Sequence, residues 1–213
     1  MNLEELKKLQ YELARSVVLR DKYSIDEIEY VIGVDQAFID DIVISCAVKM
    51  EFPSLKVVEK THTVERTEFP YIPTFLMFRE GGPAVNAVRK VLSGKSVVIV
   101  DGSGIAHPRR CGLATYIAIK TGEPSIGITK RKLYGDIVRR GALTLLVDGD
   151  EVIGYELKTC KRCKPIYVSP GSYISLETAL QVVKTCLRGR KLPEPIRAAH
   201  ELAAKVKREL AQD

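Results

Sequence analysis

Three acidic residues are placed where a sequence of this kind could assemble a catalytic centre. Asp35 follows the apolar run 30–34, and Asp101 follows the apolar run 96–100. Both runs are typical of buried strands, and the carboxyl ends of neighbouring parallel strands share one crevice. Two carboxylates in that crevice repel each other unless a proton or a cation lies between them. We therefore expect a divalent cation between Asp35 and Asp101.

Glu80 is the third candidate ligand. It lies in the segment Phe78-Arg79-Glu80-Gly81-Gly82, just before a predicted helix, and the paired glycines Gly81 and Gly82 would let the backbone approach closely. Three oxygen ligands with no adjacent Cys or His pair favour Mg²⁺, for which Mn²⁺ can substitute, over zinc. The expected metal ligands are thus Asp35, Glu80 and Asp101.

The segment after Asp101 carries groups suited to phosphate. Gly102 and Gly104 allow close backbone approach, and His107 and the arginines that follow add hydrogen-bond donors. The net charge of +6 is uneven, because residues 102–213 hold 20 of the 33 basic residues and 11 of the 27 acidic ones. A polyanionic partner is expected, and the alternative is an ordinary solvated surface.

The order of the elements indicates an α/β fold. Strands at 30–35, 42–50 and 56–65 form a predicted antiparallel meander, which is followed by a helix from Pro83 to Leu92 and a strand at 96–101. Further helices and strands alternate, with an opening helix at 2–22 and a hairpin turning at 148–150. This order predicts a ribonuclease H-like fold: a central mixed sheet flanked by helices, in one domain spanning residues 1–213.

The motifs together resemble the endonuclease V family, nucleases that nick nucleic acid beside inosine, the product of adenine deamination. The resemblance spans about residues 30 to 180. The blocks that carry it are Val31-Ile32-Gly33-Val34-Asp35, Pro70-Tyr71-Ile72-Pro73, Phe78-Arg79-Glu80, Asp101-Gly102-Ser103-Gly104, His107-Pro108-Arg109-Arg110, Gly112-Leu113-Ala114, Ile126-Gly127-Ile128-Thr129-Lys130 and Tyr167-Val168-Ser169-Pro170-Gly171.

The resemblance implies catalytic roles for five residues. It implies that three of them hold the metal, that Lys130 neutralises charge near the scissile phosphate, and that His107 orients or protonates groups at the metal. The five implied catalytic residues are Asp35, Glu80, Asp101, His107 and Lys130.

The resemblance also implies a wedge and a base pocket. Tyr71, held in Pro70-Tyr71-Ile72-Pro73, would fill the gap left when the damaged base turns out of the helix. Amides of glycine-rich turns would read that base, and the candidates are Gly81, Gly82, Gly102 and Gly104. Many family members carry a histidine after the Ser-Pro-Gly block, where this chain has Ser172, which puts the second metal site or leaving-group handling in question.

The expected function is metal-dependent hydrolysis of a phosphodiester bond on the 3′ side of deoxyinosine in DNA repair, leaving 3′-OH and 5′-phosphate ends. One alternative is an inosine-specific endoribonuclease acting on RNA. Another is a nucleic-acid-binding protein with a weakened site, for which Ser172 is the only hint. A further alternative is a nuclease of the same fold that cuts RNA–DNA hybrids or junctions.

The cysteines and the apolar runs bear on location. Five scattered cysteines indicate a reducing compartment, and the closely spaced Cys160 and Cys163 predict a disulfide or two free thiols in preference to half of a zinc site. No apolar run approaches the ~18 residues of a membrane span. We expect a cytoplasmic monomer without a membrane partner.

Overall fold

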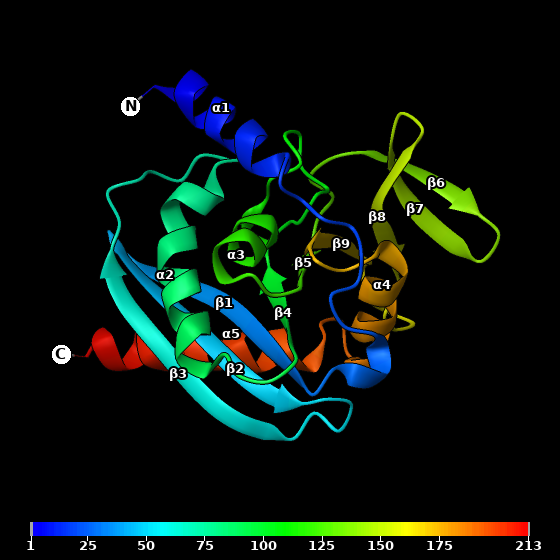
Figure 1. Cartoon of the computed structure of the whole chain (residues 1–213). Helices are drawn as coiled ribbons and strands as arrows, with labels where there is room; N and C mark the ends of the chain where they lie inside the picture. Colours follow the sequence, from blue (N-terminus) through cyan, green and yellow to red (C-terminus); the bar gives the residue numbers. More distant parts are fainter. Residues whose placement is uncertain (1, 213) are drawn as a thin grey trace.

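The structure, a computed structural model, describes residues 2–212, whose strands form one nine-stranded sheet in the order β3-β2-β1-β4-β5-β9-β8-β7-β6 (Figure 1). The strands are β1 (Tyr30–Ile39), β2 (Ile42–Glu51), β3 (Val57–Arg66), β4 (Ser96–Asp101), β5 (Ser125–Thr129), β6 (Asp136–Arg140), β7 (Leu143–Asp148), β8 (Glu151–Leu157) and β9 (Ile166–Ser172). The helices are α1 (Leu3–Ala14), α2 (Leu76–Val91), α3 (Leu113–Thr121), α4 (Leu176–Thr185), α5 (Glu194–Leu210) and the short 3-10 helix η1 (Ile25–Glu27).

The sheet is mixed, as the sequence predicts. Its centre is parallel, since β1 pairs with β4 and β4 pairs with β5 in the same direction. Antiparallel strands extend it on both sides, with β2 and β3 beyond β1 and β9 to β6 beyond β5. This arrangement confirms the ribonuclease H-like fold.

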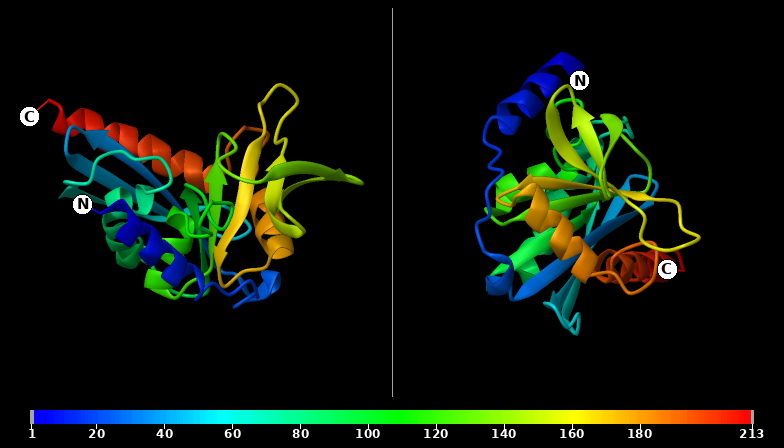
Figure 2. Two further views of the ribbon diagram at one scale, coloured as in Figure 1. Left: turned by 90° about the horizontal axis from the view of Figure 1, so that it is seen from above. Right: turned by 90° about the vertical axis from the view of Figure 1, so that its right-hand side faces the viewer.

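Helices cover both faces of the parallel centre (Figures 1 and 2). Alternate residues of β1 and β4 point to opposite faces, and both sets are fully buried. Ile32 and Val98 pack against α2 and α3, whereas Val31 and Val97 pack against α4 and α5. Burial on both faces explains why these strands appear in the sequence as continuous apolar runs.

Two predicted helix boundaries are wrong. The helix that was expected to begin at Pro83 begins at Leu76, so Pro83 lies inside α2. Met77, Ala84 and Val88 form one buried stripe that continues across Pro83, and this tertiary packing outweighs the proline's missing N–H. The opening helix ends at Ala14 rather than near residue 22, and the chain then runs without regular structure to η1.

The C-terminal half of the sheet carries a hairpin arm. The predicted turn at 148–150 joins β7 to β8, with Gly149 at a φ of 60°. β6, which pairs with β7 at the edge of the sheet, was not predicted from the sequence. β6 projects beyond the helical layers (Figure 2), whereas β7 packs against α4.

Two further observations concern the expectations about location. Between residues 2 and 212, no helix is both long and apolar enough to cross a bilayer. Cys160 and Cys163 form a disulfide in the loop between β8 and β9.

Candidate active site

The two aspartates lie at the carboxyl end of the parallel strands. Parallel pairing of β1 with β4 ends at Val34 and Val100, and Asp35 and Asp101 are the next residue on each strand. The sequence predicted that β1 ends at Asp35, but the strand continues to Ile39 and pairs there only with β2. Asp35 is 6% exposed, so its carboxylate has little access to water.

Glu80 reaches the same region from α2 rather than from the predicted loop. It lies in the second turn of that helix and is 7% exposed. Burial, together with the negative charges of Asp35 and Asp101, raises the pKa of Glu80 to about 7. Burial and the charge of Asp101 likewise raise the pKa of Asp35. The three carboxylates therefore lie in one electrostatic field, hereafter the acidic crevice.

Two basic side chains partly compensate the acidic crevice. Lys130, just past the end of β5, places Nζ 2.5 Å from Asp101 Oδ2. Burial alone would lower the pKa of Lys130, but its hydrogen bond to Asp101 raises that pKa overall. His200, on α5, places Nδ1 2.7 Å from Asp35 Oδ2.

His200 is the site residue that sequence reasoning missed. His200 lies between the buried positions Ala199 and Ala203 of an amphipathic helix, and its own side chain is exposed. Its local pattern is therefore that of an ordinary solvent-facing residue. Only the packing of α5 across β1 brings it to Asp35. The chain has only three histidines, and this scarcity was the one feature of the sequence that could have marked His200 as a candidate.

The residues of the acidic crevice fit a hard divalent cation in their chemistry. Three buried or half-buried carboxylates offer oxygen ligands, and burial and mutual repulsion raise the pKa values of Asp35 and Glu80, a cost that a bound cation would relieve. Among residues 2–212, no three His, Cys, Asp or Glu side chains are close enough together to enclose an ion. In this structure Lys130 and His200 take up the carboxylate oxygens instead.

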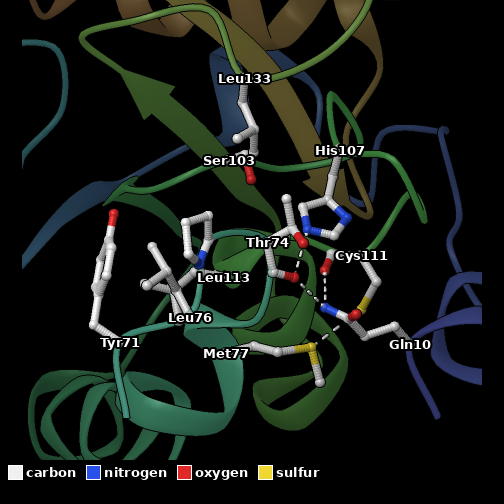
Figure 3. A pocket seen from close by; sticks show the side chains of 12 residues that line it. Gln10, Tyr71, Thr74, Leu76, Met77, Ser103, His107, Cys111, Leu113 and Leu133 are labelled. Carbon is white, nitrogen blue, oxygen red and sulfur yellow. Dashed lines mark hydrogen bonds between the residues drawn. The ribbon is translucent and has the colours of Figure 1, made fainter. Parts of the chain in front are cut away.

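A pocket opens beside the acidic crevice, and its rim carries the predicted wedge (Figure 3). Tyr71 stands at the rim with 68% of its surface exposed. Leu76 and Met77, from the first turn of α2, line the pocket one turn before Glu80. Ser103 lines it two residues after Asp101. The remaining lining residues are Gln10, Pro73, Thr74, His107, Cys111, Gly112, Leu113 and Leu133.

His107 lies on the wall of this pocket and not at the carboxylates. Its Nδ1 accepts the Arg109 backbone N–H at 3.2 Å, so Nε2 carries the proton and donates to the Thr74 carbonyl at 2.9 Å. Burial and the charge of Arg109 lower the pKa of His107 to about 4, although the hydrogen bond to Thr74 opposes this shift. His107 is therefore a neutral imidazole, and both of its ring nitrogens have partners within the protein.

His107 is one of three donors that converge on Thr74. Gln10 Nε2 lies 2.9 Å and Arg109 Nη2 lies 2.8 Å from the same carbonyl oxygen. Arg109 Nε also donates to Gln10 Oε1 at 2.5 Å. We call these four residues the Thr74 clamp. Thr74 has a φ of 69°, in the left-handed region that a β-branched residue rarely adopts, and it directly follows the wedge segment 70–73.

The glycines predicted to read the base have other partners. The Gly102 N–H donates to the Ile128 carbonyl, and the Gly104 N–H donates to Ser169 Oγ, both at 2.9 Å. Gly104 is required because a Cβ there would lie 2.1 Å from the Pro170 oxygen. Gly81 and Gly82 lie within α2 instead of a loop. The amides of Gly102 and Gly104 therefore hold the pocket wall together.

Ser172 lies far from the acidic crevice. It pairs with Ser125 at the start of β5, whereas Lys130 follows the other end of that strand. Its hydroxyl accepts the Val18 N–H at 2.9 Å, and its side chain is fully buried. Ser172 therefore lies apart from the three carboxylates, and the histidine that contacts Asp35, His200, comes from α5.

Comparisons with known proteins agree with this geometry. The family model described as Endonuclease V matches residues 11–201. An endonuclease V from Archaeoglobus fulgidus is 61% identical over 99% of this chain and 96% of its own length. The endonuclease V structure from Streptomyces avermitilis superposes with a TM-score of 0.90 at 31% identity, covering 99% of this chain and 95% of that one.

A third match contains nucleic acid. Endonuclease V from Ciona intestinalis, in complex with a 24mer DNA containing an inosine followed by a ribo-adenosine, superposes with a TM-score of 0.84 at 26% identity over 98% of both chains. The match of the family model to most of the chain, together with the identity to the Archaeoglobus relative, settles the classification. The chain belongs to the endonuclease V family and is a nuclease, a hydrolase of phosphodiester bonds.

Proposed function

We propose that this nuclease recognises deoxyinosine in DNA and hydrolyses a phosphodiester bond on its 3′ side, leaving 3′-OH and 5′-phosphate ends. The observation that carries the proposal is the junction of the pocket and the acidic crevice. α2 contributes Met77 to the pocket and Glu80 to the crevice within one turn, and β4 ends at Asp101, two residues before Ser103 on the pocket wall. A base held in the pocket would bring its own backbone to the carboxylates.

The pocket and its rim support recognition of a base turned out of the helix. Its walls are mostly apolar, as expected for a site that receives a planar base. Tyr71 is exposed beside it, on a segment bounded by Pro70 and Pro73, and can take the place of the extruded base in the stack. Hypoxanthine pairs weakly, so its extrusion costs less than that of adenine.

In this proposal Asp35, Glu80 and Asp101 hold Mg²⁺, for which Mn²⁺ can substitute. The cation, when bound, activates water and stabilises the negative charge of the transition state. Lys130, whose Nζ lies 2.5 Å from Asp101 Oδ2, moves to the phosphate and screens its charge. Its side chain is 43% exposed, which leaves it room to move. His200 fixes the orientation of Asp35 through the 2.7 Å contact. His107 acts only as a positioning residue, through Thr74.

Nicking assays on matched substrates test the proposal. We expect Mg²⁺-dependent cleavage of deoxyinosine DNA at one site on the 3′ side of the lesion, and no cleavage of the same duplex with adenine. Asp101→Asn, prepared alongside, should be inactive and so exclude a contaminating nuclease. Equal cleavage of the adenine duplex would refute lesion recognition, and cleavage undiminished by EDTA would refute the role of the cation.

Inosine in RNA is the second candidate substrate. The Ciona intestinalis complex holds a ribonucleotide directly after the inosine, which favours comparing three polymers in the same assay. The substrates are deoxyinosine DNA, the same DNA with one ribonucleotide after the inosine, and inosine RNA. The kcat/KM values identify the preferred polymer, and the first two substrates isolate the effect of a single 2′-OH after the inosine.

A further inference from the structure

The hairpin arm formed by β6 and β7, with the segment that leads into it, is a basic feature whose charged side chains the acidic crevice and the pocket do not use. Residues 130–143 contain five basic residues and one acidic residue. Beyond Lys130, the basic residues are Arg131, Lys132, Arg139 and Arg140, and all four are exposed. Within residues 2–212, the ion pairs involve neither Arg139 nor Arg140. The arm thus holds unneutralised positive charge in water.

The base of the arm is fixed to the active-site region. Leu133, at the start of the arm, lines the pocket. Arg110 anchors the other end, because its Nη2 lies 2.8 Å from Asp148 Oδ2 and 2.9 Å from Glu151 Oε2. Leu146, on β7, belongs to the same apolar cluster as Ile105 in the loop that follows Asp101. The direction of the arm is therefore set by the site itself.

The two arginines near the tip point to opposite sides of the arm. Arg139 pairs with Thr144, and Ile137 pairs with Leu146, so Arg139 shares the face that packs against the loop 102–110. Arg140 pairs with Leu143, on the face of Leu145 that packs against α4. Only the Arg139 face is on the side of the pocket.

We propose that the Arg139 face of this arm, with Arg131 and Lys132 at its base, binds the phosphate backbone of the duplex that flanks the lesion. The inference rests on the proposed function. Leu133 and Arg139 are six positions apart, a distance that at ~3.4 Å per residue is at most ~20 Å. A duplex rises ~3.4 Å per base pair, so Arg139 meets backbone within about six base pairs of the base in the pocket.

Charge reversal at the two adjacent arginines tests the proposal with a matched control. Arg139→Glu and Arg140→Glu change the net charge equally, and both residues are exposed on an edge strand. Binding and nicking are measured on duplexes of one length that carry the inosine at the centre, near the 5′ end or near the 3′ end. The wild-type protein is run on inosine and adenine duplexes in parallel, so that a failure of inosine recognition is seen separately.

We expect Arg139→Glu to weaken binding of the central-inosine duplex on the order of tenfold, with a salt slope smaller by about one. When the inosine is near one end, the duplex does not extend as far as the arm on that side, and Arg139→Glu should bind this substrate as well as the wild-type protein does. Arg140→Glu should keep near wild-type affinity for every substrate. Equal losses for both variants, or a loss independent of the position of the inosine, would overturn the proposal.

A second copy of this chain is the competing occupant, because β6 has a free edge. Sedimentation of wild-type protein and Arg139→Glu without DNA tests that occupant. A dimer that dissociates in Arg139→Glu, with nicking of every substrate unchanged, would assign the arm to self-association and overturn the duplex contact. A monomer with the position-dependent loss described above supports it.

Discussion

The acidic crevice and the Thr74 clamp lie side by side and obey opposite electrostatic rules. In the acidic crevice, like charges are buried together, and the pKa values of Asp35 and Glu80 are raised as a result. In the Thr74 clamp, three donors converge on one carbonyl oxygen, and both nitrogens of His107 are engaged. The first region is held in a state that needs a cation. The second is complete without any ligand.

The difference separates two tasks. A region that performs hydrolysis must bind a cation. Repulsion between its carboxylates favours that binding, because the cation relieves the repulsion. A region that aims a wedge must keep one conformation, so full hydrogen bonding is useful there. Removing charge from the acidic crevice should therefore reduce activity and spare the fold, whereas removing a donor from the Thr74 clamp should do harm mainly through the fold.

Asp35→Asn should give the largest effect. The amide keeps the size of the side chain but removes the charge at the end of β1, and we expect cleavage to fall by more than about a thousandfold. Circular dichroism and thermal melting should show an intact fold. Turnover close to the wild-type value would exclude Asp35 from the metal site.

Glu80→Gln should stabilise the metal-free protein. The folded-state pKa of Glu80, about 7, lies above its ordinary value of 4.5, so ionised Glu80 destabilises the fold. This cost is absent below pH 4.5, grows between pH 4.5 and 7, and is complete above pH 7, where it reaches about 3 kcal/mol at most. Urea unfolding in EDTA at pH 8 and pH 4 should show a gain for the variant at pH 8 alone. A loss of stability at pH 8 would contradict the assigned repulsion.

Arg109→Ala should destabilise the protein by about 2 kcal/mol, because it leaves Gln10 Oε1 and the Thr74 hydroxyl without their buried donor. The matched control is Arg110→Ala, which removes the partly exposed ion pair with Asp148 at the base of the arm. Limited proteolysis should cut the segment 69–74 faster in Arg109→Ala than in Arg110→Ala. Equal stability of the two variants would show that the Thr74 clamp does not fix the wedge.

Tyr71→Ala should have the smallest effect, about tenfold in the ratio of kcat/KM for inosine over adenine duplexes, or about 1.4 kcal/mol. Its side chain is largely exposed, so the melting temperature should not change. Tyr71→Phe keeps the ring and should keep the ratio. If alanine leaves the ratio intact, Tyr71 is not a wedge.

The sequence was sufficient for the centre of the fold and for two of the carboxylates. Buried parallel strands leave continuous apolar runs, and the residue that ends such a run is identifiable, which is how Asp35 and Asp101 could be found. Glu80 was found as a ligand but placed in a loop, because Pro83 suggested a helix start that the packing of Met77 and Ala84 overrides.

The histidines could not be assigned from local pattern. His107 follows Asp101 closely in the chain, yet its backbone turns it onto the pocket wall. Ser172, at the position where many family members carry a histidine, follows the Ser-Pro-Gly motif, yet β9 runs antiparallel to β5 and places it at the other end of the sheet. His200 lies in no motif block and depends wholly on how α5 crosses β1. Contacts over such separations are set by topology, which residue spacing does not encode.

The pairing of Asp35 with His200 joins positions 165 residues apart, and this separation affects the order of events during synthesis. A nascent chain that has emerged only through β9 already contains the three carboxylates, Lys130 and Tyr71. It has not yet made the helix that orients Asp35 and covers β1 and β2. On the proposed assignment of the site, its last contact therefore forms only after α5 has been synthesised and has packed against β1.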